Sequence, residues 1–377
     1  MQTLTSRERV RRAVAHEPAD RYPIDLGMHF STGISVFAYY NLRKYLGLST
    51  DNIELIDCVQ MLARVDDDII GRFHVDTVCL NPPYDNRYKF TFHDKYEMLV
   101  PGSYKPVKTD NGYMVRQGEH RMYMPKGAHF FDGDWLNFYD WPEDVSLAKF
   151  AQRAERLRKE TDKYTMLMGF TAYFYDLDFA CDMLTDPEKC IEQNQRTFDW
   201  SVRYFDTVNA MFGQYIDCIE VNGDLGTQHG LMCTPESFER VSYPFLKKFC
   251  EHVHRNSDIK IFIHSCGSVY DALPYIADAG VDILNPVQIS AAKMDPARLK
   301  REFGDKLCFW GGGCNTQQVL GVGTPEQVRE NVKMLTDIFK PGGGFVFNQV
   351  HNIMGNVPPE NIVAMLDTAY ENSFYGE

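Results

Sequence analysis

The chain has 377 residues, of which 44% are hydrophobic and 24% charged, a composition typical of a globular protein with a sizeable core. Its formal net charge of −13 argues against nucleic acid as the main partner, because phosphate binding requires a basic surface. The sequence contains no run of about 18 apolar residues of the kind that spans a membrane, and its first residues lack the apolar core of a signal peptide. Ten cysteines without a CxxC pair are typical of a protein of the reducing cytoplasm.

Apolar runs rich in β-forming residues recur along the chain, and each is followed by a stretch with helical character. Strands that are apolar without interruption and alternate with helices predict a parallel sheet covered by helices. Eight such units predict a closed (β/α)8 barrel, the TIM-barrel fold of the α/β class. The eight runs are residues 21–28, 75–82, 164–174, 217–226, 260–267, 281–288, 306–313 and 344–353.

Three of the intervening helices carry clear start signals. Thr-Pro-Glu at 234 and at 324 is typical of a capping residue followed by proline at the first helical position. Pro-Pro-Glu at 358 begins a third helix in a similar way. These signals predict helices over residues 234–255, 324–339 and 358–371.

Residues 84–131 interrupt the alternation of strands and helices. They are polar, aromatic and rich in turns, and the sequence from Thr109 to Tyr113, TDNGY, is typical of a β-hairpin. We interpret this segment as an antiparallel β excursion inserted into the barrel. Residues 1–377 are accordingly predicted to form one decorated barrel domain.

Enzymes with this barrel place their chemistry at the C-terminal ends of the strands, where the loops meet at one mouth. His29, Asn285, Gln288 and Asn348 are candidate substrate-binding residues at these ends. The full set of polar candidates at the strand ends is His29, Glu220, Asp224, His264, Cys266, Asn285, Gln288, Cys314, Asn348 and His351.

Two metal-ligand types stand one residue apart at the end of the fifth predicted strand. On an extended segment, His264 and Cys266 point to the same side of the chain. Zinc accepts thiolate and imidazole ligands, and its catalytic sites use three protein ligands and one open position. His351, Cys314 or Glu220 is the candidate third ligand. The alternative is that the pair are packing residues and hold no ion.

Two carboxylates end the fourth predicted strand. Glu220 and Asp224 are candidates for a paired general base and acid at the mouth. The alternative for both is a structural hydrogen bond to a neighbouring loop.

The chain resembles the uroporphyrinogen decarboxylase-like superfamily nearly from end to end. LTSRERVRRAVAHEPADRYPID is similar to the opening of that superfamily, and PPENIVAML is similar to its closing helix. The resemblance implies one of two activities. The first is a cofactor-free decarboxylase that binds porphyrin carboxylates through an arginine-rich N-terminal segment. The second is a zinc-dependent methyltransferase that exchanges methyl groups with a corrinoid protein.

Two features of the sequence resemble the methyltransferase branch more closely. His264 and Cys266 match the His-x-Cys zinc motif of its thiol-methylating members, and LGMHFSTGISVF lacks the arginines that would neutralise a polycarboxylate. His351 stands where those members have a distant third cysteine ligand, and the same position resembles a functional histidine of the decarboxylases. His in place of Cys at this position is a departure from the zinc motif.

Zinc held by two imidazoles and one thiolate keeps a net positive charge, which makes it a stronger Lewis acid suited to polarising an oxygen. We therefore expect an O-demethylation, in which a small methylated substrate such as an aryl methyl ether passes its methyl group to cob(I)alamin. Glu220 or Asp224 is expected to transfer the proton that this reaction requires. No Asp-x-His-x-x-Gly corrinoid signature occurs in the chain, so the cobalamin is expected on a separate corrinoid protein. A cofactor-free decarboxylase and a non-catalytic small-molecule binder are the alternatives, and a homodimer is left open.

Overall fold

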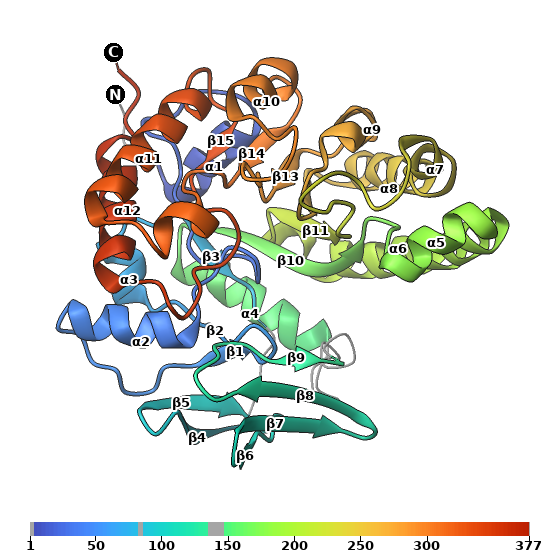
Figure 1. Ribbon diagram of the computed structural model, residues 1–377. Helices are drawn as coiled ribbons and strands as arrows, with labels where there is room; N and C mark the ends of the chain where they lie inside the picture. The colour runs from blue at the N-terminus through green and yellow to red at the C-terminus, as the bar shows by residue number, and fades with distance from the viewer. Residues whose placement is uncertain (1–3, 82–85, 135–146, 377) are drawn as a thin grey trace.

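The structure is a computed structural model that describes residues 4–81, 86–134 and 147–376. Seven parallel strands form its curled central sheet, in the order β15–β14–β13–β12–β11–β10–β3 (Figure 1). They lie side by side in chain order, as expected when each strand is joined to the next by a crossover helix. The strands are β3 Thr77–Cys79, β10 Tyr164–Thr171, β11 Cys218–Asn222, β12 Lys260–His264, β13 Ile283–Asn285, β14 Cys308–Trp310 and β15 Phe345–Val346.

A short segment at the position of the predicted first strand closes the sheet into a barrel. Ile24 forms a parallel bridge with Phe347, next to β15, and its carbonyl accepts a hydrogen bond of 2.8 Å from the amide of Asp76, next to β3. Pro23 offers no N–H to the ladder, so the segment does not become a regular strand. Because both edges of the sheet are bonded to this segment, the predicted (β/α)8 barrel is confirmed.

Helices cover the outside of the barrel (Figure 1). The helix predicted from residue 324 begins as expected, with Thr324 and Gln327 in a reciprocal capping box. The single helix predicted over 234–255 is wrong, because the chain breaks into α7 and α8 at Ser242, where Pro244 has no N–H and its ring would clash with a continuous turn. The helices are α1 Ser6–Val14, α2 Val36–Tyr45, α3 Asp67–Arg72, α4 Leu147–Glu160, α5 Leu177–Thr185, α6 Pro187–Phe212, η2 Gly213–Tyr215, α7 Pro235–Val241, α8 Tyr243–Asn256, η3 Tyr270–Ala272, α9 Leu273–Asp278, α10 Pro296–Phe303, η4 Thr316–Leu320, α11 Pro325–Phe339 and α12 Pro359–Glu371.

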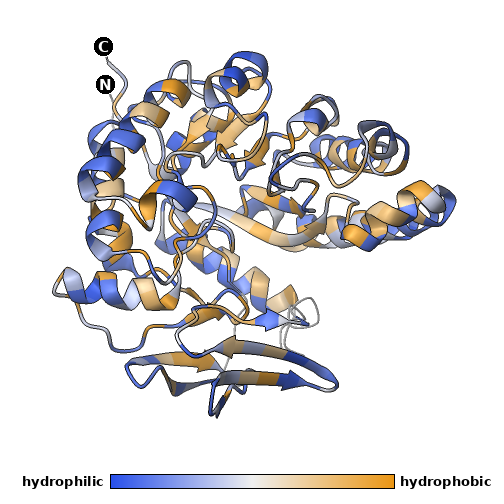
Figure 2. Cartoon of the chain, viewed as in Figure 1, coloured by the Kyte–Doolittle hydropathy of each residue, from blue (hydrophilic) through white to orange (hydrophobic). Residues whose placement is uncertain are grey.

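Alternate residues of each barrel strand enter two separate apolar regions. In β12, Phe262 packs inside the barrel with side chains such as Met166 and Trp310, whereas Ile261 and Ile263 join the core between the sheet and the helices. Figure 2 shows the barrel strands as largely hydrophobic, which is typical of a parallel sheet buried on both faces. The alternation also fixes which residues of a strand point into the barrel.

Helix α1 closes the barrel at the N-terminal ends of its strands. Val10 and Val14 on this helix belong to the same apolar cluster as the interior side chains of the barrel. Arg7 and Arg11 contact the buried carboxylate of Asp217, which immediately precedes β11. The open mouth of the barrel therefore lies at the other end, where the strands meet the loops that carry the polar candidates.

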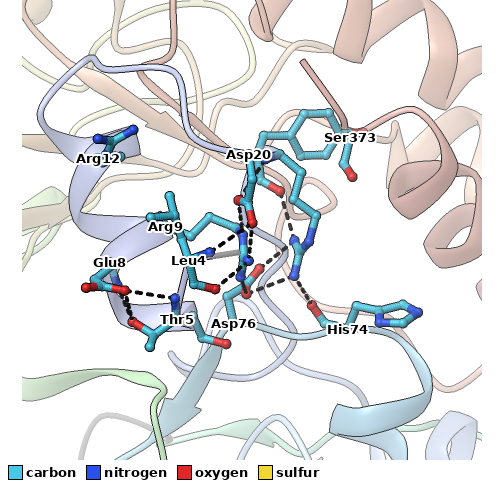
Figure 3. Close-up of polar contacts among 12 residues, drawn as sticks. Leu4, Thr5, Glu8, Arg9, Arg12, Asp20, His74, Asp76 and Ser373 are labelled. Atoms are coloured by element: carbon cyan, nitrogen blue, oxygen red, sulfur yellow. Dashed lines mark hydrogen bonds and ion pairs between the residues drawn. The ribbon is translucent and has the colours of Figure 1, made fainter. Parts of the chain in front are cut away.

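A buried ion network fastens this closure to the barrel. The Asp76 carboxylate accepts hydrogen bonds from Arg9 at 2.6 Å and from Arg21 at 2.7 and 2.9 Å. Arg9 also donates to both carboxylate oxygens of Asp20, at 2.7 Å each (Figure 3). Since the side chain of Asp76 is fully buried, its negative charge depends on the two guanidinium groups for compensation.

The antiparallel excursion predicted over 84–131 is confirmed for its described part, while residues 84–85 lie outside the described residues. It forms two small sheets below the barrel (teal in Figure 1), and the predicted hairpin joins β6 to β7 with Thr109 opposite Gly112. A bridge between Glu54 and Leu99 attaches it to the segment beside the barrel. The strands of these two sheets are β4 Arg87–Phe92, β5 Tyr96–Pro101, β6 Val107–Thr109, β7 Gly112–Gln117, β8 His120–Pro125 and β9 Asp132–Gly133. Before the excursion, β1 Leu55–Asp57 and β2 Leu62–Ala63 form a separate antiparallel pair.

Two further observations concern the chain as a whole. Every described helix is either too short or too polar to cross a membrane. All ten cysteines are free, and most of them are buried, where cysteine packs as a small apolar residue.

Candidate metal centre

The site is built on the last residue of β12. In the parallel ladder, His264 is in register with Asn222 of β11 and with Asn285 of β13. Because Phe262 points into the barrel, His264, two residues later on the same strand, points into the barrel as well. Its imidazole is buried at the level of the mouth.

Three side chains converge at this point. The Cys266 sulfur lies 3.4 Å from Nε2 of His264, as expected for two residues that share one side of an extended segment. His351, in the loop that follows β15, joins them, and the ligand atoms of the three residues all lie within 4.8 Å of one another. The ring centroid of His351 is 5.8 Å from that of His264. Two imidazoles and a thiol at this spacing are a donor set that zinc accepts.

The tautomer of His264 is determined by its neighbour on β13. Nδ1 of His264 lies 2.8 Å from Oδ1 of Asn285, and the amide nitrogen of Asn285 donates to the carbonyl of Trp310 at 2.9 Å. The Asn285 oxygen must therefore accept a proton from Nδ1, which leaves the lone pair of Nε2 free. That nitrogen faces Cys266 and the hydroxyl of Ser31, which is 3.2 Å away. Ser31 was not among the predicted site residues, because nothing in the sequence distinguishes this serine from others in loops.

Asn285 is a positioning residue for His264 in this arrangement, whereas its predicted role in substrate binding stays a prediction. We expect Asn285→Leu to weaken zinc binding about 10- to 100-fold, the usual effect of losing the outer partner of a histidine ligand. Competition with a chromophoric zinc chelator measures this change. Asn285→Asp keeps an acceptor for Nδ1 and is expected to restore most of the affinity, and equal losses in both variants would contradict the positioning role.

The loop that carries Cys266 is held by two side chains and by a close backbone approach. Oδ1 of Asp224 accepts the Cys266 amide at 2.8 Å, and Oε1 of Gln288 accepts the Gly267 amide at 2.7 Å. Gly267 has φ +85°, and a Cβ there would lie 2.4 Å from the carbonyl carbon of Gly226, so no other residue fits without displacing a loop. Asp224 and Gln288 therefore fix the position of the thiol, and their predicted catalytic and substrate-binding roles stay predictions.

A second polar pair lies beside the cluster. Nδ1 of His29 accepts the Ser31 amide at 2.9 Å, so the ring proton is on Nε2, which lies 3.1 Å from Oε1 of Glu220 and donates to it. The other oxygen of Glu220 accepts the Gly169 amide at 3.2 Å. The His29 ring is 5.1 Å from the His264 ring. Burial acts to raise the pKa of Glu220, but the contact with His29 outweighs it and the net shift is downward. Glu220 is thus a buried carboxylate.

Burial shifts the pKa values of all three cluster residues toward their neutral forms. It lowers the pKa of His264, and it lowers the pKa of His351 to about 3. It raises the pKa of Cys266 well above the usual value, and the Asp224 carboxylate reinforces that shift. At neutral pH both imidazoles therefore keep a lone pair for a cation, whereas Cys266 becomes a thiolate only when a cation binds beside it.

The other candidate ligands lie apart from the cluster. Cys314 is fully buried in the apolar core, and burial raises the pKa of its thiol to about 12. Glu220 is engaged by His29 and is not one of the three clustered residues. Asn348 is fully buried and donates to the carbonyls of Asp25 and Thr32, so it ties the first segment of the barrel to the last.

The fold agrees with comparisons to known proteins. The uroporphyrinogen decarboxylase (URO-D) family matches residues 141–372, which is more than half of the chain. The chain belongs to the URO-D family. The superfamily resemblance drawn from the sequence is thereby confirmed, and His264, Cys266 and His351 all lie in the matched part.

Individual URO-D relatives match only part of the chain. A uroporphyrinogen decarboxylase of Pseudoalteromonas translucida is 28% identical over 152 residues, which are 38% of this chain and 39% of that protein. A uroporphyrinogen decarboxylase of Methylococcus capsulatus is 26% identical over 197 residues, 51% of each protein. The chain thus spans two fifths to half of the length of these curated relatives. The match shows the family to which the chain belongs and does not show which reaction it catalyses.

A solved structure shares the fold along its whole length. A methyltransferase from Methanosarcina mazei superposes with a TM-score of 0.59 and 17% sequence identity, covering 98% of this chain and 99% of that one. At this identity the likeness shows that the two proteins have the same fold.

Proposed function

We propose that this URO-D family member is a zinc-dependent methyltransferase. It moves a methyl group between a small methylated substrate, such as an aryl methyl ether, and a corrinoid carried by a separate protein. The observation that carries the proposal is the convergence of His264, Cys266 and His351, whose ligand atoms lie within 4.8 Å of one another at the mouth of the barrel.

The donor set fits a catalytic zinc site. Three protein ligands leave one position open, which separates catalytic sites from closed structural ones. Nε2 of His264 is free because Asn285 occupies Nδ1, and such an outer partner is the usual companion of a zinc-bound histidine. A zinc ion bound there would supply Lewis-acid chemistry to an oxygen of the methyl donor.

Two carboxylates of the chain, Glu220 and Asp224, are proposed to act on the substrate beside the metal. In the demethylation direction the methyl–oxygen bond breaks, the methyl group passes to the reduced cobalt of the corrinoid, and the released oxygen takes up a proton. Glu220 has a lowered pKa and stays a carboxylate, so it serves as an acceptor and as a fixed negative charge. Asp224, whose side chain is 52% exposed, is placed to pass the proton between solvent and the cluster.

Removal of the metal distinguishes this proposal from a decarboxylase, the function that the names of the curated relatives favour. We expect pure protein to contain about one zinc per chain and to lose methyl transfer to a corrinoid protein after treatment with dipicolinate. Added Zn²⁺ is expected to restore the activity, because the three ligands lie at the mouth and are not part of the apolar core that holds the barrel together. Full activity in metal-free protein, or decarboxylation without metal, would contradict the methyltransferase.

Three further parts of the proposal concern the whole protein. We place it in the cytoplasm, supported by ten free cysteines, since disulfides are rare in reducing compartments. We treat residues 1–377 as one domain. We propose that four polar residues at the mouth contact the substrate: His29, Asn285, Gln288 and Asn348. Whether the protein forms a homodimer is left open.

A further inference from the structure

We infer that the methyl donor of this site carries no anionic group. The substrate class is an uncharged or cationic methyl compound, and carboxylated, sulfonated or phosphorylated donors are disfavoured. The inference rests on the proposed function for the existence of a methyl donor, but its physical basis is the charge of the barrel mouth.

Two carboxylates at the mouth lack basic partners. Glu220 is 3% exposed, and its side-chain partner His29 is a neutral imidazole because Nδ1 accepts the Ser31 amide. Asp224 accepts the Cys266 amide and lies 3.8 Å from Nε2 of His264, a nitrogen that carries no proton in the tautomer set by Asn285. No lysine or arginine among the described residues forms an ion pair with either carboxylate. Both negative charges therefore act on whatever occupies the mouth.

A divalent cation at the cluster does not reverse this balance. The Cys266 thiolate and the two carboxylates provide three negative charges close together, against the two positive charges of the ion. The imidazoles of His264 and His351 add no charge. The occupied site thus keeps an excess of negative charge where the donor binds.

The loops that follow seven of the eight barrel strands contain almost no basic residues, whereas the eighth, after β3, carries the excursion and its lysines and arginines. Seven of the eight loops that follow the barrel strands hold no arginine and one lysine in total. That residue, Lys293, donates to the carboxylate of Asp271 at 2.6 Å, so its charge is compensated. The seven loops are residues 26–35, 172–176, 223–234, 265–269, 286–295, 311–324 and 347–358.

The arginines near the start of the chain do not serve the mouth either. Arg9 and Arg21 are bound to Asp20 and Asp76 at the closed end of the barrel. Buried binding sites for carboxylate or phosphate groups are normally built with bidentate arginine or with lysine. An anionic donor would thus meet two carboxylates that no lysine or arginine of the described residues compensates, and we expect it to bind at least about tenfold more weakly than its uncharged counterpart.

The first test needs neither methyl donor nor corrinoid partner. Co²⁺ replaces zinc, and its absorption spectrum reports ligands that enter the open position. The probes are azide as an anion and imidazole as a neutral ligand. Asp224→Asn keeps the acceptor for the Cys266 amide and removes one charge, so azide should bind about five- to tenfold more tightly while imidazole changes less than twofold. Asp367→Asn, on the outer helix α12, is the control and should change neither the azide affinity nor the imidazole affinity. Equal azide affinity in wild type and Asp224→Asn would overturn the inference.

The second test compares two methyl donors that differ by one carboxylate. We expect 2-methoxyphenol to be demethylated with a kcat/KM at least about tenfold above that of 4-hydroxy-3-methoxybenzoate, for the same electrostatic reason. Equal rates, or a faster reaction of the benzoate, would overturn the inference. If neither compound is demethylated, the aryl ether part of the proposed function fails, and the azide titration still decides the charge class of the ligand.

Discussion

Cys266→Ser is expected to lower the zinc affinity of the protein by more than about 100-fold and to abolish methyl transfer. Loss of an outer hydrogen-bond partner of a zinc ligand typically lowers the zinc affinity 10- to 100-fold. Loss of the thiolate itself removes a bond to the metal as well as a negative charge. His264→Ala is expected to have the same effect. Zinc content after gel filtration and competition with a chromophoric chelator measure both changes.

The chain offers matched controls for these variants. Cys181→Ser removes an exposed thiol on α5, and His229→Ala removes an exposed imidazole from a mouth loop, so both should keep about one zinc per chain. His351→Ala is expected to lose zinc and Cys314→Ala to retain it, because His351 lies in the cluster and Cys314 in the apolar core. Zinc retained by Cys266→Ser, or lost from Cys314→Ala in a folded protein, would contradict the proposed ligand set.

Asp76→Ala is expected to lower the free energy of unfolding by about 3–5 kcal/mol, the cost of leaving a buried charge without its partner. Asp76 has no exposed surface and accepts hydrogen bonds from Arg9, from Arg21 and from the amide of Ile24. Its removal leaves the buried guanidinium of Arg21 without a carboxylate partner and Arg9 with Asp20 alone, and it removes the acceptor of the Ile24 amide in the segment that closes the barrel. Urea denaturation followed by circular dichroism measures the change.

Asp367→Ala provides the comparison for this stability effect. Asp367 also accepts two hydrogen bonds from an arginine, Arg72, but the two side chains are 34% and 43% exposed. An exposed pair of this kind contributes at most about 1 kcal/mol. Similar losses from Asp76→Ala and Asp367→Ala would mean that the buried network does not hold the barrel closed.

The proposed metal site and the proposed charge class of the substrate both depend on residues at the mouth of the barrel. In our proposal the cluster of His264, Cys266 and His351 holds a cation, and Glu220 and Asp224 determine the charge of the space in front of it. A family whose curated relatives are named for a decarboxylase is thus compatible with a different substrate in this member, because the loops of a barrel and not its strands select the ligand.

Helix and strand positions were largely predictable from local signals. Apolar runs and Thr-Pro-Glu starts depend on neighbours within a few residues, so they predicted the strands, helix α11 and the excursion. The predicted helix over 234–255 failed at Pro244, where the apolar helical pattern continues but the backbone cannot. The first strand was placed correctly, although Pro23 keeps it irregular.

The sequence alone determined the pairing of His264 with Cys266, because a strand repeats every two residues and places both side chains on one side. Only the tertiary structure decided that His351 and not Cys314 completes the cluster and that Asn285 sets the tautomer of His264. It also decided that no lysine or arginine in the described part of the chain pairs with Glu220 or Asp224. These facts depend on how loops from distant parts of the chain meet at the mouth, and neither residue spacing nor composition encodes that arrangement.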